Sequence, residues 1–177
     1  MTRKAADEKE LRRIIIAFHK GRVGRAEIAR QIHSHSTSIS LKSLIRSLRL
    51  LFPDARIAAH EAELRTDLLC ATQPRMEKKK YELVCLLFDE TETFDSYNRE
   101  FFDDHPIAVM HIGGGHYAIL DGHHRVRRYI DLTGRSRPIT VTVITADSDD
   151  LTYRFRREVE DVRRESGTTD VVELPLV

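Results

Sequence analysis

Residues 117–125 read Tyr-Ala-Ile-Leu-Asp-Gly-His-His-Arg. The first four residues are typical of a strand, Asp121–Gly122 is typical of a tight turn, and a helix is expected to begin at His123. Exposed N–H groups at a helix start, together with the positive end of the helix dipole, form an anion site. The stretch therefore predicts a strand–turn–helix unit that binds an anion at the turn.

Five residues of this unit are candidates for binding phosphate. Gly122 allows the backbone to approach a phosphate group closely. His123, His124 and Arg125 supply donors in the first helical turn, where arginine can bind phosphate through two parallel hydrogen bonds. Arg128, on the next turn, adds positive charge. The composition of the turn therefore favours a phosphate over other anions.

Asp121 places a carboxylate beside this anion site, and three roles are open for it: helix cap, metal ligand or general base. Adjacent His123 and His124 point about 100° apart on a helix, so one metal ion cannot readily bind both. We therefore expect Mg²⁺, held through Asp121 and brought in by a nucleotide, rather than zinc. The expected catalytic residues are Asp121, His123 and His124.

Helical and β-type patterns alternate from Tyr81 onward, which predicts a small mixed sheet with a βαβ unit. Gly113–Gly115 separates two β-type runs and indicates a hairpin. The expected elements are a buried strand over Tyr81–Phe88, a helix over Thr93–Phe102, strands over Pro106–Ile112 and His116–Leu120, a helix over His123–Thr133, a strand over Ile139–Ile144 and a last helix after Ser148. The fold class expected is α/β (α+β).

Residues 1–80 are predicted to form an all-helical region that precedes this sheet, and the run Lys78–Lys80 marks the expected domain boundary. The predicted helical stretches are Leu11–Phe18, Ala26–Ile32, Leu41–Leu51 and Ala58–Leu69. Residues 81–177 then form the second domain, which ends in a helix.

Charge divides the chain at the same place. The net charge is +1, but residues 1–80 contain 18 Lys or Arg and 9 Asp or Glu, whereas residues 81–177 contain 11 and 19. Helix, polar connector (Ser34–Ser40) and basic helix are loosely similar to a helix-turn-helix, with Lys42, Arg46 and Arg49 on the outer face. Two interpretations are open: this face contacts nucleic acid, or it is a solvated surface.

Several classes of protein are excluded. The longest apolar run, Leu83–Phe88, is too short to span a bilayer, so no membrane partner is expected. The absence of a secretory leader predicts a cytoplasmic protein. Cys70 and Cys85 are too few for a disulfide framework or an all-cysteine zinc site.

Pro106-Ile-Ala-Val109, a strand, and then Asp121-Gly-His-His-Arg125 resemble the ParB/sulfiredoxin-like superfamily over residues 81–146. The resemblance implies that the turn and the helix start hold nucleotide phosphates, with Gly122, His124 and Arg125 matching the phosphate-binding turn. The implied ligand is ATP, ADP or CTP with Mg²⁺. Sulfiredoxins carry cysteine at the position of His123, so reduction of sulfinic acids is not expected.

The function expected from this resemblance is hydrolysis of a nucleotide or transfer of its phosphoryl group. An acidic residue near the phosphates is also expected, and Asp89, Glu90 and Glu92 are open candidates. Two alternatives stand beside it: a DNA-binding regulator or partition-like accessory protein that uses the nucleotide as a switch, and a metal-dependent nuclease. A homodimer is compatible with each of them.

Overall fold

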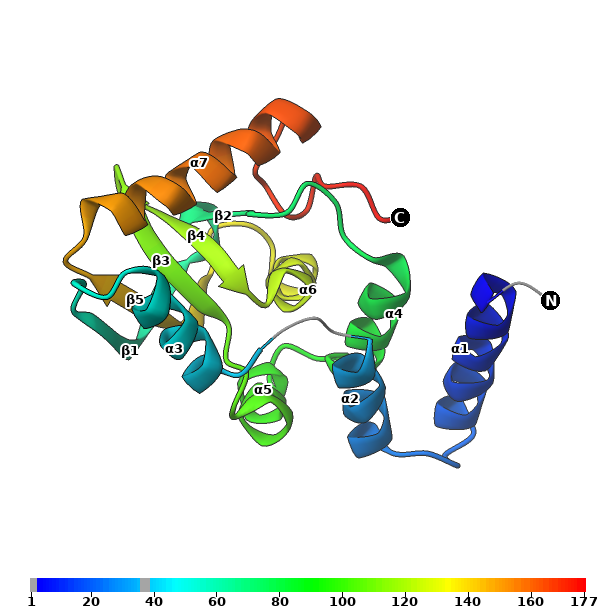
Figure 1. Ribbon diagram of the computed structural model, residues 1–177. Helices are drawn as coiled ribbons and strands as arrows, with labels where there is room; N and C mark the ends of the chain where they lie inside the picture. The colour runs from blue at the N-terminus through cyan, green and yellow to red at the C-terminus, as the bar shows by residue number, and fades with distance from the viewer. Residues whose placement is uncertain (1–2, 36–38) are drawn as a thin grey trace.

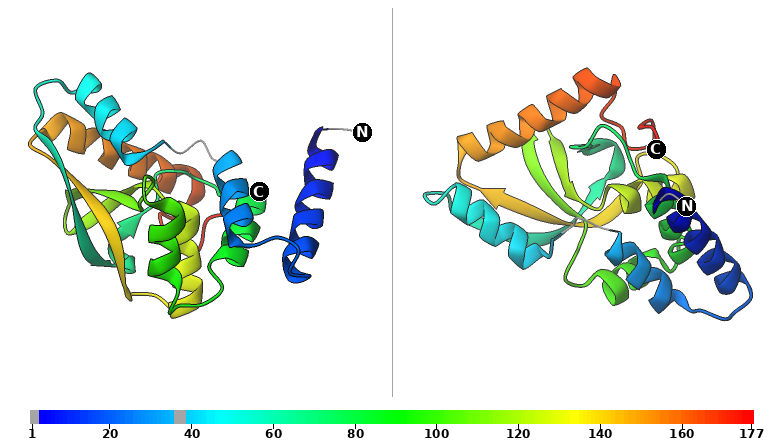
Figure 2. Two further views of the ribbon diagram at one scale, coloured as in Figure 1. Left: turned by 90° about the horizontal axis from the view of Figure 1, so that it is seen from below. Right: turned by 45° about the vertical axis from the view of Figure 1, so that its right-hand side comes forward.

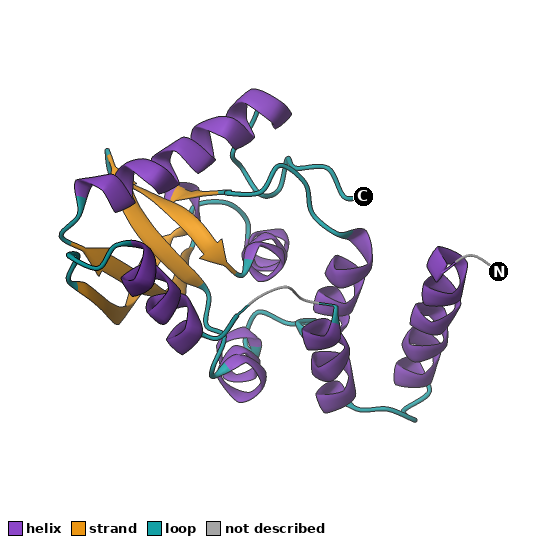
Figure 3. Cartoon of the chain, in the orientation of Figure 1, coloured by secondary structure: helices purple, strands orange, loops and turns teal. Residues whose placement is uncertain are grey.

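The computed structural model describes residues 3–35 and 39–177 and shows a mixed α/β chain (Figure 1). A five-stranded sheet has the strand order β1-β5-β3-β4-β2. Helices lie against the sheet, and helices from the N-terminal part extend to one side of it (Figure 3). Among the described residues, no helix combines the length and apolar character needed to traverse a lipid bilayer.

The elements begin and end as follows. The strands are β1 (Ile57–Arg65), β2 (Leu69–Cys70), β3 (Ala108–Gly113), β4 (His116–Asp121) and β5 (Pro138–Ala146). The helices are α1 (Arg3–His19), α2 (Arg25–Ser34), α3 (Leu41–Leu51), α4 (Lys78–Leu87), α5 (Phe94–Phe102), α6 (His123–Thr133) and α7 (Asp149–Ser166), and a short 3-10 helix, η1 (Thr66–Leu68), joins β1 to β2. From α5 to α7, the sequence patterns predict every element in the right place.

β3 is the central strand of the sheet. It is antiparallel to β4 through the Gly113–Gly115 turn and parallel to β5. β5 pairs antiparallel with β1 from Ile57↔Ala146 to Arg65↔Pro138. The parallel strands β3 and β5 are direct neighbours in the sheet, and along the chain hairpin strand β4 and helix α6 connect them.

Successive side chains of β3 enter two hydrophobic cores on opposite faces of the sheet. Val109 packs in the larger core with Val126 of α6, and Met110 packs in the smaller core with Phe155 of α7. Leu48 of α3 adds to the smaller core. Figure 2 shows this layering, with α3 and α7 on one side of the sheet and α5 and α6 on the other.

The helix predicted over Ala58–Leu69 is wrong, because these residues form most of β1, all of η1 and the start of β2. Alanine, glutamate and leucine in this stretch favour a helix. Pairing with β5 along the whole of β1 outweighs that local preference, as tertiary context commonly does. Residues 1–80 are therefore not all helical.

The strand predicted over Tyr81–Phe88 is also wrong, because this run belongs to α4. A short apolar run does not distinguish a buried strand from a buried helix. Leu83, Val84 and Leu87 are buried along one helical face. The expected boundary after Lys80 falls inside α4, and strands from both sides of it share one sheet.

α2 and α3 do not form the helix-turn-helix suggested by their sequence. α2 packs on α4, whereas α3 packs on β1 and the smaller core. Ser40 caps α3 as its sequence indicates, since the Ser40 hydroxyl accepts a hydrogen bond from the Ser43 N–H at 3.2 Å. Residues 36–38 of the predicted connector lie outside the described residues.

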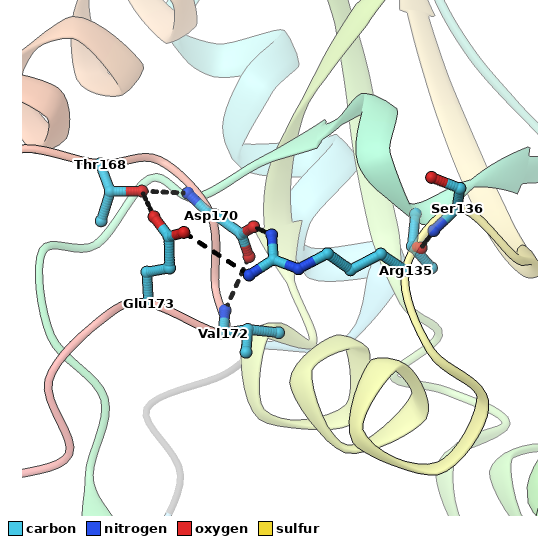
Figure 4. Close-up of polar contacts among 7 residues, drawn as sticks. Arg135, Ser136, Thr168, Asp170, Val172 and Glu173 are labelled. Carbon is cyan, nitrogen blue, oxygen red and sulfur yellow. Dashed lines mark hydrogen bonds and ion pairs between the residues drawn. The ribbon is translucent and has the colours of Figure 1, made fainter.

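The segment after α7 is held against the loop between α6 and β5 (Figure 4). Arg135 forms ion pairs with Asp170 and, at 3.5 Å, with Glu173. Thr168 donates to Glu173 at 2.7 Å, and the Val172 N–H donates to Asp170 at 2.9 Å. These contacts direct residues 174–177 toward α4.

Arg25 ties α2 to the C-terminal end of α4. Its Nη1 donates to the carbonyl oxygens of Leu86 at 3.1 Å and Leu87 at 2.9 Å, and its Nη2 pairs with Asp89 at 2.9 Å. The guanidinium carbon lies 4.7 Å from the centre of the Tyr97 ring. One side chain therefore satisfies two carbonyls at a helix end, where intrahelical donors are missing.

We expect Arg25→Met to lower the free energy of unfolding by about 1–3 kcal/mol, because it leaves these carbonyls without a donor. Urea denaturation measures the change. Arg22→Met is the matched control, since Arg22 is exposed, and its effect should stay within about 0.5 kcal/mol. Equal losses for the two variants would contradict the assignment.

Candidate functional site

The turn between β4 and α6 is very tight. Gly122 adopts a left-handed conformation with φ 99°, and a Cβ atom there would lie 3.0 Å from Ile107 Cγ1 and 3.2 Å from Ile107 Cα. The Val126 N–H donates to the Gly122 carbonyl at 2.9 Å, so the helix begins immediately. Gly122 provides no side-chain cap, so the first N–H groups of α6 remain available to a ligand.

The start of α6 borders a cavity of about 550 Å³, and Asp121 to Arg125 all line it. Further lining residues, besides Gln73, Val84, Leu120 and Val177, fall into three groups. They are Thr72, Arg75, Glu77 and Lys80 from α4 and the loop before it; Ile32, His33, His35, Ile39 and Leu44 from α2, α3 and the residues beside them; and Phe102 from α5. The sequence-predicted turn therefore forms one wall of a larger site.

His123 is buried, and Thr72 occupies its Nε2 atom. The Thr72 N–H donates to Nε2 at 3.1 Å, and the Thr72 hydroxyl donates to the Ile119 carbonyl at 2.5 Å. Burial, reinforced by nearby His124 and Lys80, lowers the pKa of His123 to about 3. His123 is thus a neutral residue that ties α6 to the residues after β2, and Nε2 is not free for a ligand.

His124 is buried and neutral for similar reasons. Its Nε2 lies 3.2 Å from the Glu77 carbonyl, which can only accept, so this nitrogen carries the proton. Burial, together with Lys80, lowers the pKa of His124 to about 4. The remaining nitrogen, Nδ1, is then an acceptor on a residue that lines the cavity.

Arg125 is a buried cation, with its side chain 5% exposed. Its guanidinium carbon lies 4.3 Å from the centre of the Phe102 ring, and Nη1 donates to Asn98 Oδ1 at 2.6 Å. Burial lowers the pKa of Arg125 to about 10, against the opposing effect of Asp121. The side chain stays protonated at neutral pH, and its position is fixed from two sides.

Asp121 is a partly buried carboxylate of the site, and its Oδ2 atom is fully buried. Its Oδ2 lies 3.7 Å from Arg125 Nη2, and within the described residues it accepts no hydrogen bond. Burial raises the pKa of Asp121, while Arg125 and Lys80 act in the opposite direction. An unsatisfied buried acceptor costs about 1–3 kcal/mol, so a ligand that donates to Oδ2 would recover this energy.

Lys80 is a charged residue of the site that the sequence pattern missed. It was expected at the domain boundary, yet it lies in the first turn of α4 and lines the cavity. Burial lowers its pKa, against the opposing charge of Asp121. Lys80 and buried Val84 are four residues apart and therefore lie on the same face of α4. A helix prediction for this segment would have placed Lys80 on the buried face.

Several predicted site residues lie away from the cavity. Arg128 donates from Nε to the Phe88 carbonyl at 2.7 Å, so it has a structural contact instead of a place in the site. Asp89 pairs with Arg25, and Glu90 and Glu92 are exposed in the same loop. The basic residues of α3 are also outside the site: Lys42, Arg46 and Arg49 are exposed, and Arg49 donates to the Ile57 carbonyl at 3.3 Å.

In the part of the chain that the structure describes, no group of three or more His, Cys, Asp or Glu side chains has the arrangement of a metal site. The two adjacent histidines are committed to different backbone partners, Thr72 and Glu77. The donors present therefore fit a metal ion only if a ligand supplies most of its coordination, as nucleotide phosphates do for Mg²⁺.

The neutral histidines make stability depend on pH. Both pKa values lie below the ordinary 6.5, so their contribution is complete above pH 6.5 and is lost as the pH falls toward 4, while the unfolded chain binds protons. We expect the free energy of unfolding to fall by up to about 1.4 kcal/mol per pH unit for each histidine. Urea denaturation from pH 7.5 to 5 should show a shallower slope for His124→Gln and an unchanged slope for exposed His60→Gln.

Comparison with known proteins assigns no family to the chain. No family model matches the chain, and no curated protein or solved structure matches it. The resemblance to the ParB/sulfiredoxin-like superfamily therefore remains a prediction from the residues of the turn.

Proposed function

We propose that the cavity binds the phosphates of a nucleotide (ATP, ADP or CTP) and that the protein hydrolyses the nucleotide or transfers its terminal phosphoryl group. One observation carries the proposal: a buried arginine, a largely buried lysine and an uncapped helix start border the same cavity. Each of these groups stabilises an anion, and burial strengthens each interaction.

The cationic groups in the cavity support a phosphate ligand. Arg125, Lys80 and Arg75 line it, and the carboxylates among its lining side chains are Asp121 and Glu77. Arg75 also lies 3.6 Å from Glu165, so Arg125 and Lys80 are the main cations of the site. The first N–H groups of α6 add partial positive charge. A polyphosphate carries enough negative charge to match this set, and Arg125 can offer its remaining guanidinium donors in a fixed orientation.

Asp121 has the properties of a general base. A raised pKa makes its carboxylate a better proton acceptor, and Oδ2 has no donor among the described residues. In the proposed step, a hydroxyl or water oxygen forms a bond to the terminal phosphorus and gives its proton to Oδ2, while the bond to the leaving nucleotide oxygen breaks. Mg²⁺, bound by the phosphates and Asp121, would neutralise developing charge.

The two histidines contribute unequally to this proposal. His123 holds the start of α6 in place through Thr72 and does not reach the ligand through Nε2. His124 retains Nδ1 as an acceptor for a ligand hydroxyl. DNA binding and nuclease activity stay predictions from the sequence. The basic side chains of α3 are exposed, whereas Leu44 of the same helix lines the cavity, so the basic face is not part of the proposed phosphate site.

We expect Lys80→Met to weaken ATP, ADP or CTP binding by about tenfold or more, because a charged hydrogen-bond donor to phosphate is lost. Isothermal titration of the full chain, with and without Mg²⁺, measures this change. Lys78→Met is the matched control from the same lysine run, since Lys78 is exposed, and it should bind like the wild type. The absence of nucleotide binding by the wild-type chain would overturn the proposed function.

We expect Asp121→Asn to lower phosphate release or phosphoryl transfer by about 100-fold or more, because an amide cannot accept the proton. Nucleotide affinity measured without Mg²⁺ should change little, which separates the role of a base from a direct role in binding the nucleotide. Asp89→Asn serves as the control, because Asp89 is outside the cavity and partly exposed. Undiminished turnover in Asp121→Asn would exclude Asp121 as the base.

A further inference from the structure

The cavity has a second wall, which carries no permanent charge. It is built by side chains from the end of α2 to the first half of α3: Ile32, His33, His35, Ile39 and Leu44. Ile39 is 45% exposed and lines the cavity. We call these five residues the α2–α3 wall. Its aliphatic and imidazole side chains differ in chemistry from the cationic residues of α4 and α6.

The α2–α3 wall is linked to the phosphate end by stacked side chains. The ring of His33 lies 4.7 Å from that of Phe102, and the Arg125 guanidinium carbon lies 4.3 Å from the centre of the same Phe102 ring. The His33 Nε2–H donates to the Phe101 carbonyl at 2.9 Å, which holds the imidazole in place. A fixed surface thus runs from α2 through α5 to the buried arginine.

These observations describe one cavity with a cationic end and an uncharged, partly aromatic end. A ligand that fills both ends has phosphates at one end and a flat, weakly polar group at the other. The volume of about 550 Å³ is within the range of about 300–1,000 Å³ found for sites that enclose a whole small molecule. Inorganic polyphosphate would leave the α2–α3 wall without a partner.

We propose that the α2–α3 wall binds the planar nitrogen-containing ring of the ligand and so selects nucleoside phosphates over phosphate compounds that lack a ring. The inference rests on the proposed function, because it assumes that the α6 end holds the phosphates. The flat ring packs against Ile39 and Leu44, and His35 offers an imidazole for stacking or hydrogen bonding. The N-terminal helices thereby determine specificity, while α4 and α6 determine affinity for phosphate.

Isothermal titration of the full chain with ATP, CTP, tripolyphosphate and ribose 5-phosphate tests this assignment. We expect the wild type to bind at least one of the two nucleotides about tenfold more tightly than tripolyphosphate, because ring stacking adds affinity. Ile39→Ser and His35→Ala should each remove most of that preference and leave tripolyphosphate affinity unchanged. Both positions are exposed, so neither change disturbs a core, and His60→Ala on β1 is the matched exposed control.

The outcomes separate this inference from the function on which it rests. If nucleotides and tripolyphosphate bind equally well, the α2–α3 wall does not recognise the ring, and this inference fails while the proposed phosphate site is retained. Full nucleotide preference in both Ile39→Ser and His35→Ala would also overturn the assignment. If no phosphate compound binds, the proposed function fails and this inference fails with it.

Discussion

The close approach of Gly122 to Ile107 fixes the turn and the helix start around which the site is built. A side chain at Gly122 would lie 3.0–3.3 Å from three atoms of Ile107, so the chain can pass here only as glycine in its left-handed conformation. Ile107 is fully buried, and its carbonyl accepts a hydrogen bond from the Thr142 N–H at 2.8 Å. The strand-to-helix turn is therefore held by the sheet itself. The contact between Gly122 and Ile107 thereby fixes the positions of Asp121, at the end of β4, and Arg125, in the first turn of α6.

Those positions form an ion pair between buried Arg125 and partly buried Asp121 that lacks a hydrogen bond to Asp121 Oδ2. Asp121 and Arg125 approach to 3.7 Å, and burial shifts both pKa values toward the neutral forms. For stability alone, apolar residues or a closely hydrogen-bonded pair would serve better. Buried groups with shifted pKa values beside a cavity are typical of functional sites. The unsatisfied Oδ2 of Asp121 and the spare donors of Arg125 thus point to a ligand that completes their contacts.

Sequence patterns predict the second half of the fold well because its signals are local. The hairpin glycines, the Asp121–Gly122 turn and the alternation of Ile139–Ile144 each depend on neighbouring residues. The five residues that the turn marks as candidates, Asp121 to Arg125, all line the cavity, and their roles there stay predictions. The errors at Ala58–Leu69 and Tyr81–Phe88 have another origin, since long-range pairing with β5 makes one stretch a strand and burial against α2 and α6 suits the other to a helix.

The same reasoning explains why part of the site escaped prediction. Lys80 was assigned to the domain boundary, and the residues after it were predicted to form a strand. With α4 in place, its inward position follows from its spacing of four residues from buried Val84. His33 and Phe102 enter the site only through tertiary contacts, which no local pattern contains.

The division of charge along the sequence takes a different meaning in the folded chain. The basic first half and the acidic second half do not form separate surfaces, because Lys80 from one and Arg125 from the other line a single cavity. The acidic half alone would offer its helix start and one buried arginine beside a carboxylate. Lysine and arginine from the basic half supply the extra positive charge that a polyphosphate requires. α3 adds Leu44 to the same cavity while it keeps Lys42 and Arg46 in solvent, so the excess of positive charge is shared between a ligand site and an exposed helix face.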